Sequence, residues 1–218
     1  SGLISFLAAE AGVGTVIYND IYDVSCSDVR ELSHRIGFQL SHIFCGDIED
    51  LVAYLKENAV CIDAICSYDV LEHIYDVDAH FSKLPPLQNS RFRVVYASGA
   101  KIANPKIAKA IKNAQIAAEF EGTGYKWGQK ERDSRQAYFE ARKDINETFA
   151  PDLDPETVET LAAANRGRMK PDIESNVAAY LNGDKIAYQI DHPTNTCDPY
   201  TGNRCDHLLN DEWLRRLL

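Results

Sequence analysis

The sequence lacks several features that would identify its class directly. No apolar run reaches the roughly 18 residues that a helix needs to cross a bilayer, so we expect no membrane span. The opening stretch SGLISFLAAEAG is apolar but follows no positively charged segment, and it therefore does not have the form of a signal peptide. The sequence contains no internal repeat and no low-complexity tract. These absences predict a soluble globular protein.

Positive charge is also scarce. The 218 residues include 23 Lys and Arg against 33 Asp and Glu, which gives a net charge of −10. Nucleic acid is the least expected partner, because phosphate binding requires clustered Lys and Arg. The glycine-containing stretch EGTGYKWG does not follow a strand and open a helix, so a phosphate-binding loop is not expected there.

The six cysteines form no C-x2-C pair of the kind that structural zinc sites use. Three of them, Cys45, Cys61 and Cys66, lie in apolar, strand-like runs, where a free thiol behaves as a small hydrophobic side chain. We expect free thiols rather than a disulfide framework, and therefore a reducing, cytoplasmic location.

The first hundred residues alternate between strand and helix patterns. The strand patterns are almost continuously apolar, which predicts a parallel sheet covered on both faces. Ser27 is a candidate N-cap of the second helix, and Gly37 is its candidate end. The expected strands are 14–20, 40–47, 60–67 and 91–99, and the expected helices are 3–11, 26–38, 48–58 and 70–84.

From about residue 104 the patterns are helical, with no convincing strand before residue 184. Asn104 and Asp154 are placed as N-caps, and Asp172 or Pro171 begins a further helix. The helices are expected at 104–120, 129–149, 154–167 and 170–183; a short strand at 184–190, a polar loop at 191–207 and a last helix at 206–218 follow.

Acidic residues mark the carboxyl ends of three successive strand patterns. Asp20 ends the first strand, Asp47 ends the second, and Asp69 follows the third. Ligands of open parallel sheets bind at this edge, and a carboxylate can accept two hydrogen bonds from a ribose diol. The alternative is that such acids are helix caps, and Asp47 is placed to cap the helix that begins at Ile48.

The stretches VIYNDIYD, FCGDIEDL and IDAICSYDVLEHIYD resemble successive motifs of the class I S-adenosylmethionine-dependent methyltransferases. The wording VLEH, with an Asp soon after it, is the most specific of them, and the resemblance covers about residues 1–99. It implies a Rossmann-like, mostly parallel sheet and the cofactor S-adenosyl-L-methionine. The residues that it would place around the cofactor are Gly2, Asp20 and Ile21 at the loop and ribose, Asp47 and Ile48 at the adenine, and Ser67, Tyr68 and Asp69 at the methionine side.

The sequence departs from this family at both ends. The family's first strand and most of its glycine loop are absent, since Gly2 matches only the last glycine of that loop, and the two closing strands are absent as well. We therefore expect a piece of a longer protein, itself a poor binder of the cofactor and marginally folded. The resemblance implies a partial core at 1–99 with 206–218, and a mainly helical insertion at 100–205 that covers the substrate side.

A small molecule is the favoured methyl acceptor, and a sugar-type or lipid-linked molecule or a protein side chain stays open. Glu72 and His73 lie near the place where an acceptor could approach, although His73 also fits a structural position at a helix start. In the polar loop, His192 is a candidate base because His is the usual proton acceptor near neutral pH, and Asn195 and Tyr200 are candidate acceptor contacts.

Two alternative interpretations of that loop stay open: a metal site formed by His192, Cys197, Cys205 and His207, or a turn-rich connection without a site.

Two other functions compete with the methyltransferase. A nicotinamide-dependent reductase of Rossmann type also places an acid after its second strand. A methyltransferase-like module without catalysis could use the helical insertion as a binding surface.

Overall fold

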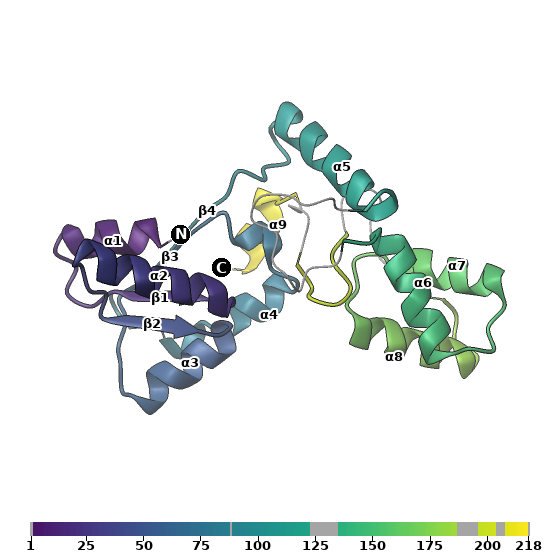
Figure 1. Cartoon of the computed structure of the whole chain (residues 1–218), viewed down its shortest axis with the longest axis horizontal. Helices are drawn as coiled ribbons and strands as arrows, with labels where there is room; N and C mark the ends of the chain where they lie inside the picture. The colour runs from purple at the N-terminus through teal and green to yellow at the C-terminus, as the bar shows by residue number, and fades with distance from the viewer. Residues whose placement is uncertain (1, 88, 123–134, 187–195, 204–207, 218) are drawn as a thin grey trace. The chain divides into compact units, whose positions relative to one another are not determined.

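The computed structural model describes the whole chain except residues 1, 88, 123–134, 187–195, 204–207 and 218 (Figure 1). The chain divides into two compact units. The first comprises residues 1–64 and 78–93, and the second comprises residues 65–77 and 94–218. None of the helices in the described part of the chain is long and apolar enough to cross a membrane.

The first unit is built on two parallel strands. Strand β1 (Ile17–Asp20) pairs with β2 (His42–Cys45) in a register that sets Asp20 against Cys45. Helix α2 (Asp23–Ile36) connects the two strands and ends where Gly37 takes a left-handed φ of 67°. This strand–helix–strand connection confirms the predicted alternation and parallel pairing.

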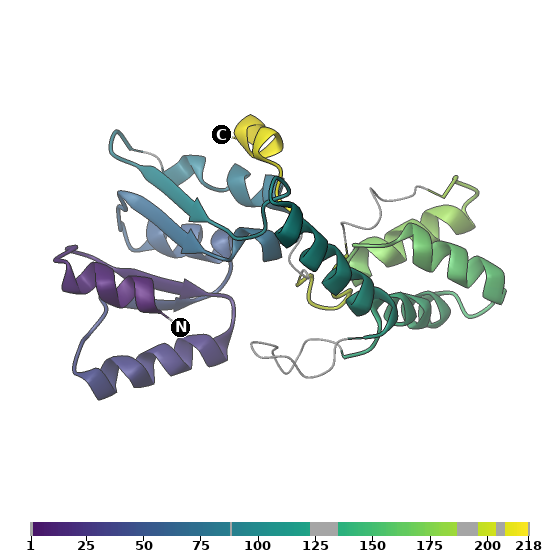
Figure 2. The ribbon, with the colours of Figure 1, turned by 90° about the horizontal axis from the view of Figure 1, so that it is seen from above.

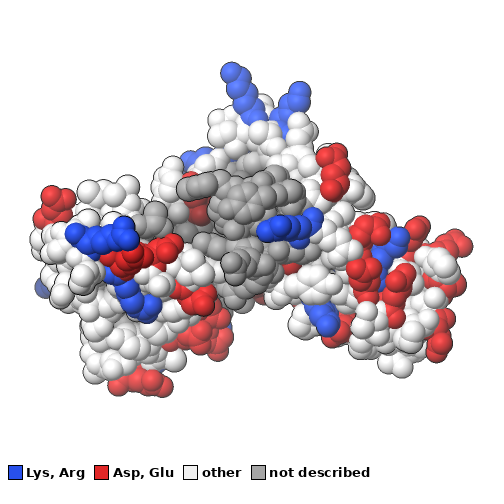
Figure 3. All heavy atoms as spheres, in the orientation of Figure 1, with Lys and Arg blue, Asp and Glu red and all other residues white. Residues whose placement is uncertain are grey.

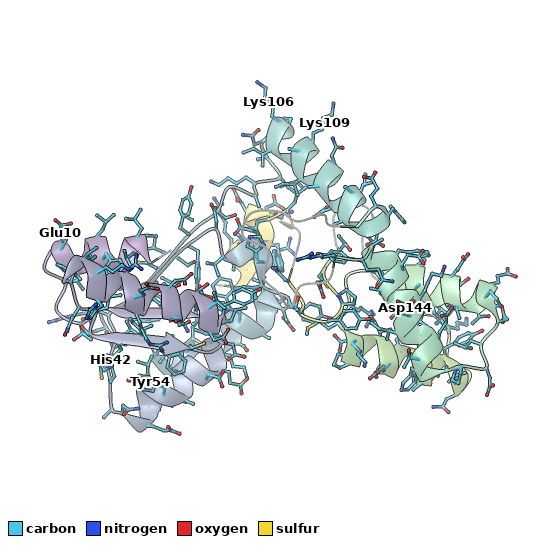
Figure 4. The ribbon with its side chains drawn as sticks, viewed as in Figure 1. Glu10, His42, Tyr54, Lys106, Lys109 and Asp144 are labelled. Atoms are coloured by element: carbon cyan, nitrogen blue, oxygen red, sulfur yellow. The ribbon has the colours of Figure 1, made fainter. Side chains whose placement is uncertain are left out.

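Helices complete the first unit. Helix α1 (Leu3–Glu10) precedes β1, α3 (Ile48–Glu57) follows β2, and α4 (Val77–Ser82) lies almost wholly in this unit. The core joins buried side chains from α1, β1 and α2: Phe6, Tyr18, Cys26 and Val29. Tyr54 of α3 contacts β2, because its hydroxyl lies 3.0 Å from Nδ1 of His42 (Figure 4).

The other two strands form a separate pair. Strand β3 (Ala64–Tyr68) lies beside β4 (Arg93–Ala97), mostly within the second unit. The two run in the same direction, since Arg93 N–H donates to the Asp63 carbonyl at their start and Asp69 N–H donates to the Ala97 carbonyl at their end. The described strands thus make two two-stranded sheets, in which β1 and β3 are not neighbours.

Five helices make up most of the second unit. They are α5 (Pro105–Phe120), α6 (Tyr138–Phe149), α7 (Pro155–Ala164), α8 (Lys170–Leu181) and α9 (Asp211–Leu217). Helices α6, α7 and α8 lie together in both ribbon views (Figure 1, Figure 2), around buried Ile145, Leu161, Ile173 and Val177. Acidic side chains are numerous over these three helices in the face that Figure 3 shows.

The chain leaves the end of β4 and returns to the same place. Leu209 N–H donates to the Ala100 carbonyl at 2.9 Å, and Ile102 N–H donates to the Leu209 carbonyl at 3.3 Å. Ala100 and Leu209 are both buried. The chain segment between Ile102 and Leu209, which contains α5 to α8, therefore begins and ends beside the end of β4.

Several predicted details differ from the structure. The helix expected at 70–84 is split into a 3₁₀ turn, η1 (Leu71–His73), and α4. Helix α2 begins at Asp23 after Tyr22, so Ser27 lies within the helix and is not its cap. Residues 184–186 of the predicted strand 184–190 are not in a strand, and the rest of that prediction lies outside the described residues.

Cys45, Cys61 and Cys66 are free thiols, but all three are exposed, so they do not serve as the small hydrophobic side chains that their apolar runs indicated. On β3 the exposed residues alternate with half-buried ones, and Cys66 and Tyr68 share the exposed face. A two-stranded sheet that is covered on one face only leaves alternate side chains in solvent.

Candidate functional site

Two of the predicted acids meet at one edge of the first unit. Asp20 is the last residue of β1, and Asp47 follows the last residue of β2 by two positions. Because the strands are parallel and Asp20 is in register with Cys45, both acids lie at the carboxyl edge of the sheet. Gly46 N–H donates to the Asp20 carbonyl at 3.0 Å, which joins the two strand ends.

Both carboxylates also stabilise the local backbone. Asp20 Oδ1 accepts from Tyr22 N–H at 3.0 Å, and Asp20 Oδ2 accepts from the Tyr18 hydroxyl at 2.9 Å. Burial, followed by the charge of Asp20, raises the pKa of Tyr18, so this hydroxyl remains a donor at neutral pH. Asp20 therefore has a fixed orientation at the end of β1.

Asp47 caps helix α3, as the alternative interpretation of this residue proposed. Its Oδ1 accepts from Glu49 N–H at 2.7 Å and from Asp50 N–H at 3.0 Å. In return, the Asp47 N–H donates to the Asp50 carboxylate at 3.2 Å. Asp47 Oδ2 accepts no hydrogen bond from the described residues. The charge of Asp47 also acts on His80. Burial lowers the pKa of His80, and the negative charge of Asp47 opposes that shift.

An isoleucine follows each of the two acids. Ile21 is 53% exposed beyond β1, and Ile48 is half-buried at the start of α3. The edge thus combines carboxylates with unused lone pairs and accessible apolar surface. Ribose hydroxyls and an adenine amino group are donors that suit the carboxylates, and the flat face of adenine suits the isoleucines. These residues fit an adenosine group chemically.

Gly2 has a structural reason to be glycine. Its φ is 67°, in the left-handed region, at the residue before α1. A Cβ on Gly2 would lie 2.8 Å from Cγ2 of Val29 on helix α2. The structure therefore explains this glycine by backbone conformation and close helix packing.

The second unit carries the predicted residues that follow β3. Asp69 is exposed at a left-handed φ of 50°, and its Oδ1 accepts from Gly99 N–H at 3.1 Å beyond β4. Ser67 and Tyr68 lie on opposite faces of β3: Tyr68 is 63% exposed, whereas the Ser67 hydroxyl is buried and has no protein partner. Asp69 and Ser67 therefore belong to one edge, while Tyr68 points away from the buried face.

Glu72 is the unusual residue of this edge. It is 3% exposed in η1, and its Oε2 has no hydrogen-bond partner. Burial raises the pKa of the Glu72 carboxyl, and the negative charge of Asp69 raises it further. Three influences oppose this shift: a hydrogen bond from the Glu72 backbone amide, a hydrogen bond from the Ser98 hydroxyl, and the charge of His73. His73 is half-buried in the same turn. A buried, partly satisfied carboxylate beside a strand end is typical of a functional position.

Tyr75 joins this segment to the helices of the same unit. Its hydroxyl donates to the Asp172 carboxylate of α8 and accepts from Met169 N–H at 3.1 Å. A Cβ on Gly202 would lie 3.3 Å from Cβ of Tyr75 and 2.7 Å from the Met169 sulfur. The segment that carries Glu72 and His73 is therefore packed against both α8 and the described end of the polar loop.

The polar loop is only partly described. His192, Asn195, Cys205 and His207 lie outside the described residues. Tyr200 is 46% exposed in a turn where buried Asp198 accepts from Tyr200 N–H at 2.8 Å and from Thr201 N–H at 3.1 Å. Turn chemistry thus accounts for 198–203. In the part of the chain that the structure describes, no three His, Cys, Asp or Glu side chains are grouped as metal ligands.

Four residues of these edges were not found from the sequence. Ser98 and Gly99 follow β4 and hydrogen-bond to Glu72 and Asp69, and their place at a strand end was the signal available for them. Tyr75 and His80 gave no local signal, since their partners are distant in sequence or depend on how helices pack.

Comparisons of the chain with protein-family models, curated proteins and solved structures find no match.

Proposed function

We propose that this chain is part of an S-adenosylmethionine-dependent methyltransferase with a Rossmann-like sheet. The observation that carries the proposal is the meeting of two Asp-Ile pairs, Asp20-Ile21 and Asp47-Ile48, at the carboxyl edge of adjacent parallel strands. Ligands of open α/β sheets bind beyond that edge.

In this proposal Asp20 binds the ribose hydroxyls, and Asp47 binds the adenine amino group through its Oδ2. The Asp20 carboxylate keeps two of its four lone-pair positions beyond those used by Tyr18 and Tyr22. When bound, the cofactor supplies a methyl group on a positively charged sulfur, and the protein's task is to orient donor and acceptor. Ser67, Tyr68 and Asp69 are assigned to the methionine side, and Gly2 to the loop beside the cofactor.

The pairing of the strands supports a Rossmann-like sheet that is incomplete within this chain. In the family that the sequence resembles, one further strand lies between the counterparts of β1 and β3. Here β1 pairs with β2, and β3 pairs with β4, and the division falls between β1 and β3. We assign the activity to the full-length protein.

The helices after β4 are proposed to cover the acceptor side. The support is the contact of Tyr75 with α8 and Gly202, which places helical residues beside the segment that follows β3. A small-molecule acceptor is proposed, with His192, His73, Asn195 and Tyr200 as candidate contacts. The described cysteines are free thiols, which suits a reducing compartment such as the cytoplasm.

Calorimetry of the full-length protein with S-adenosylmethionine and S-adenosylhomocysteine tests the proposal. Asp20→Asn should weaken both ligands about 10- to 100-fold, because hydrogen bonds to a charged group contribute roughly 1.5–3 kcal/mol. Asp23→Asn, an exposed carboxylate in the first turn of α2, is the matched control and should bind as the wild type does.

The outcomes separate the competing functions. Binding of NADH or NADPH in place of the adenosylated ligands would replace the methyltransferase by a nicotinamide-dependent reductase. If the protein binds none of the four ligands (S-adenosylmethionine, S-adenosylhomocysteine, NADH and NADPH), a binding module without catalysis would be the remaining function. Equal affinity in wild type and Asp20→Asn would remove the ribose assignment.

A further inference from the structure

Glu72 is a buried carboxylate that no Lys or Arg neutralises. It is 3% exposed, and none of the ion pairs between described residues includes it. The only positive charge acting on it is that of His73, when that ring is protonated. Removing a carboxylate from water without a counter-ion costs several kcal/mol, and it is retained where a ligand or a reaction uses it.

Its hydrogen bonding is incomplete as well. An ionised carboxylate has about four acceptor positions. The Ser98 hydroxyl and the Glu72 backbone amide supply donors, but Oε2 has none. Ser67, five residues earlier on the half-buried face of β3, has a second buried oxygen without a partner. Two unsatisfied polar atoms in so short a stretch are unusual, since buried polar groups are normally hydrogen-bonded.

The unsatisfied atoms call for a group that is positively charged and carries several N–H donors. Such a group would neutralise Glu72, donate to Oε2 and reach the Ser67 hydroxyl, which can accept or donate. Glu72 lies in a single 3₁₀ turn held by His73 N–H to Val70 and Ile74 N–H to Leu71. Exposed Asp69 lies three residues before Glu72, between this turn and the end of β3.

We propose that Glu72, with Ser67, binds an amino group of the methyl acceptor, so that the substrates of this protein are amines. This inference rests on the proposed methyltransferase function and adds the class of acceptor to it. Small-molecule amines arrive as cations near neutral pH, and burial of Glu72 makes its interaction with such a cation stronger than it would be in water. Glu72 then takes one N–H proton from the ammonium group, which leaves a neutral amine whose lone pair can accept the methyl group.

Sinefungin, an adenosylated amine that carries its amino group where S-adenosylmethionine carries the transferable methyl, is the probe. In calorimetry of the full-length protein we expect it to bind at least tenfold more tightly than S-adenosylhomocysteine. Glu72→Gln should remove this preference and leave the affinity for S-adenosylhomocysteine unchanged, which also shows that the variant is folded. Asp76→Asn, an exposed acid of the same segment, should keep the preference.

A second readout needs no variant. The Glu72 carboxyl carbon is titrated by NMR with and without sinefungin, and the bound amine should lower the apparent pKa of this carboxyl. The ionisable groups that act on it are His73 and Asp69, and their titrations are followed in the same spectra.

The results distinguish two failures. If the wild type binds neither sinefungin nor S-adenosylhomocysteine, the methyltransferase proposal itself fails. If both bind, but the preference survives in Glu72→Gln or the carboxyl titration does not move, the amine assignment is overturned and the cofactor assignment stands.

Discussion

The buried ion pair between Glu119 and Arg142 allows a quantitative prediction about the second unit. It joins α5 to α6, and its side chains are 2% and 0% exposed. Arg142 donates to both oxygens of Glu119 and, through Nε, to the Ala162 carbonyl at 2.7 Å. The Thr196 hydroxyl donates to Glu119 Oε2 at 2.5 Å. The pair therefore fixes two helices, the end of a third and the described part of the polar loop.

Arg142→Met should destabilise this unit strongly. Removing one partner of a buried pair costs about 3–5 kcal/mol, because the other charge remains buried and uncompensated. Arg166, whose Nη1 lies 3.9 Å from Glu119, offers a partial replacement and should keep the loss near the lower end of that range. For a chain of this size each kcal/mol corresponds to about 2–4 °C in melting temperature, so a loss near 3 kcal/mol should lower it by roughly 6–12 °C.

Thermal and urea unfolding followed by circular dichroism measure the effect. The double variant Arg142→Met/Glu119→Leu should recover part of the loss, because neither charge of the pair then remains buried, whereas Arg166, which is 5% exposed, loses its contact with Glu119. The exposed pair Arg35–Glu31 is the control, and Arg35→Met should cost less than about 1 kcal/mol. If Arg142→Met costs no more than Arg35→Met, or if the double variant is as unstable as the sum of the single ones, the reasoning is refuted.

Three further predictions concern single positions. Because burial raises the pKa of Glu72, the folded protein binds the Glu72 proton more tightly than the unfolded chain does, so the stability of the wild type should fall relative to that of Glu72→Gln as pH rises above about 4.3. Urea unfolding of both proteins at pH 4–8 checks this. A difference in the free energy of unfolding that stays constant with pH would contradict it. Gly2→Ala should cost about 2 kcal/mol or more of stability, because the new Cβ adds left-handed backbone strain and lies 2.8 Å from Val29. Gly12→Ala, with φ 83° and open space around the new Cβ, should cost the backbone strain alone. Equal losses of stability in chemical unfolding would show that the contact with Val29 costs nothing. Asp47→Ala should lose about 1 kcal/mol of capping energy, while Asp47→Asn keeps the cap and weakens only adenosine binding in calorimetry; a stability loss in Asp47→Asn would argue against the separation of these roles.

Features set by a few neighbouring residues were predicted correctly from the sequence. Asp47, Asn104 and Asp154 cap α3, α5 and α7, and Gly37 ends α2, because each of these motifs satisfies backbone groups within one helical turn. The parallel direction of β1 and β2 followed from the helix between them, since a helical crossover returns the chain to the same end of the sheet.

Features set by distant contacts were not predictable in this way. Tyr75 meets Asp172 across 97 residues, and no local pattern marks either side chain. The split of the predicted helix after β3 has a similar origin. Asp69 takes a left-handed φ to reach Gly99, and Tyr75 turns toward α8, so the backbone between them makes only a 3₁₀ turn. Tertiary contacts here override the helical spacing of the apolar residues.

The two buried glutamates of the second unit show where sequence reasoning about a site ends and structure becomes necessary. The sequence resemblance placed Glu72 near the acceptor and gave no role to Glu119, and no sequence pattern indicated that either side chain would be buried. In the structure Glu119 is surrounded by donors, including both branches of the Arg142 guanidinium, whereas Glu72 has no Lys or Arg and one oxygen without a partner. Burial of the first is offset within the protein. In our proposal the burial of the second is offset by a bound amine, which is why Glu72, and not Glu119, defines the acceptor there.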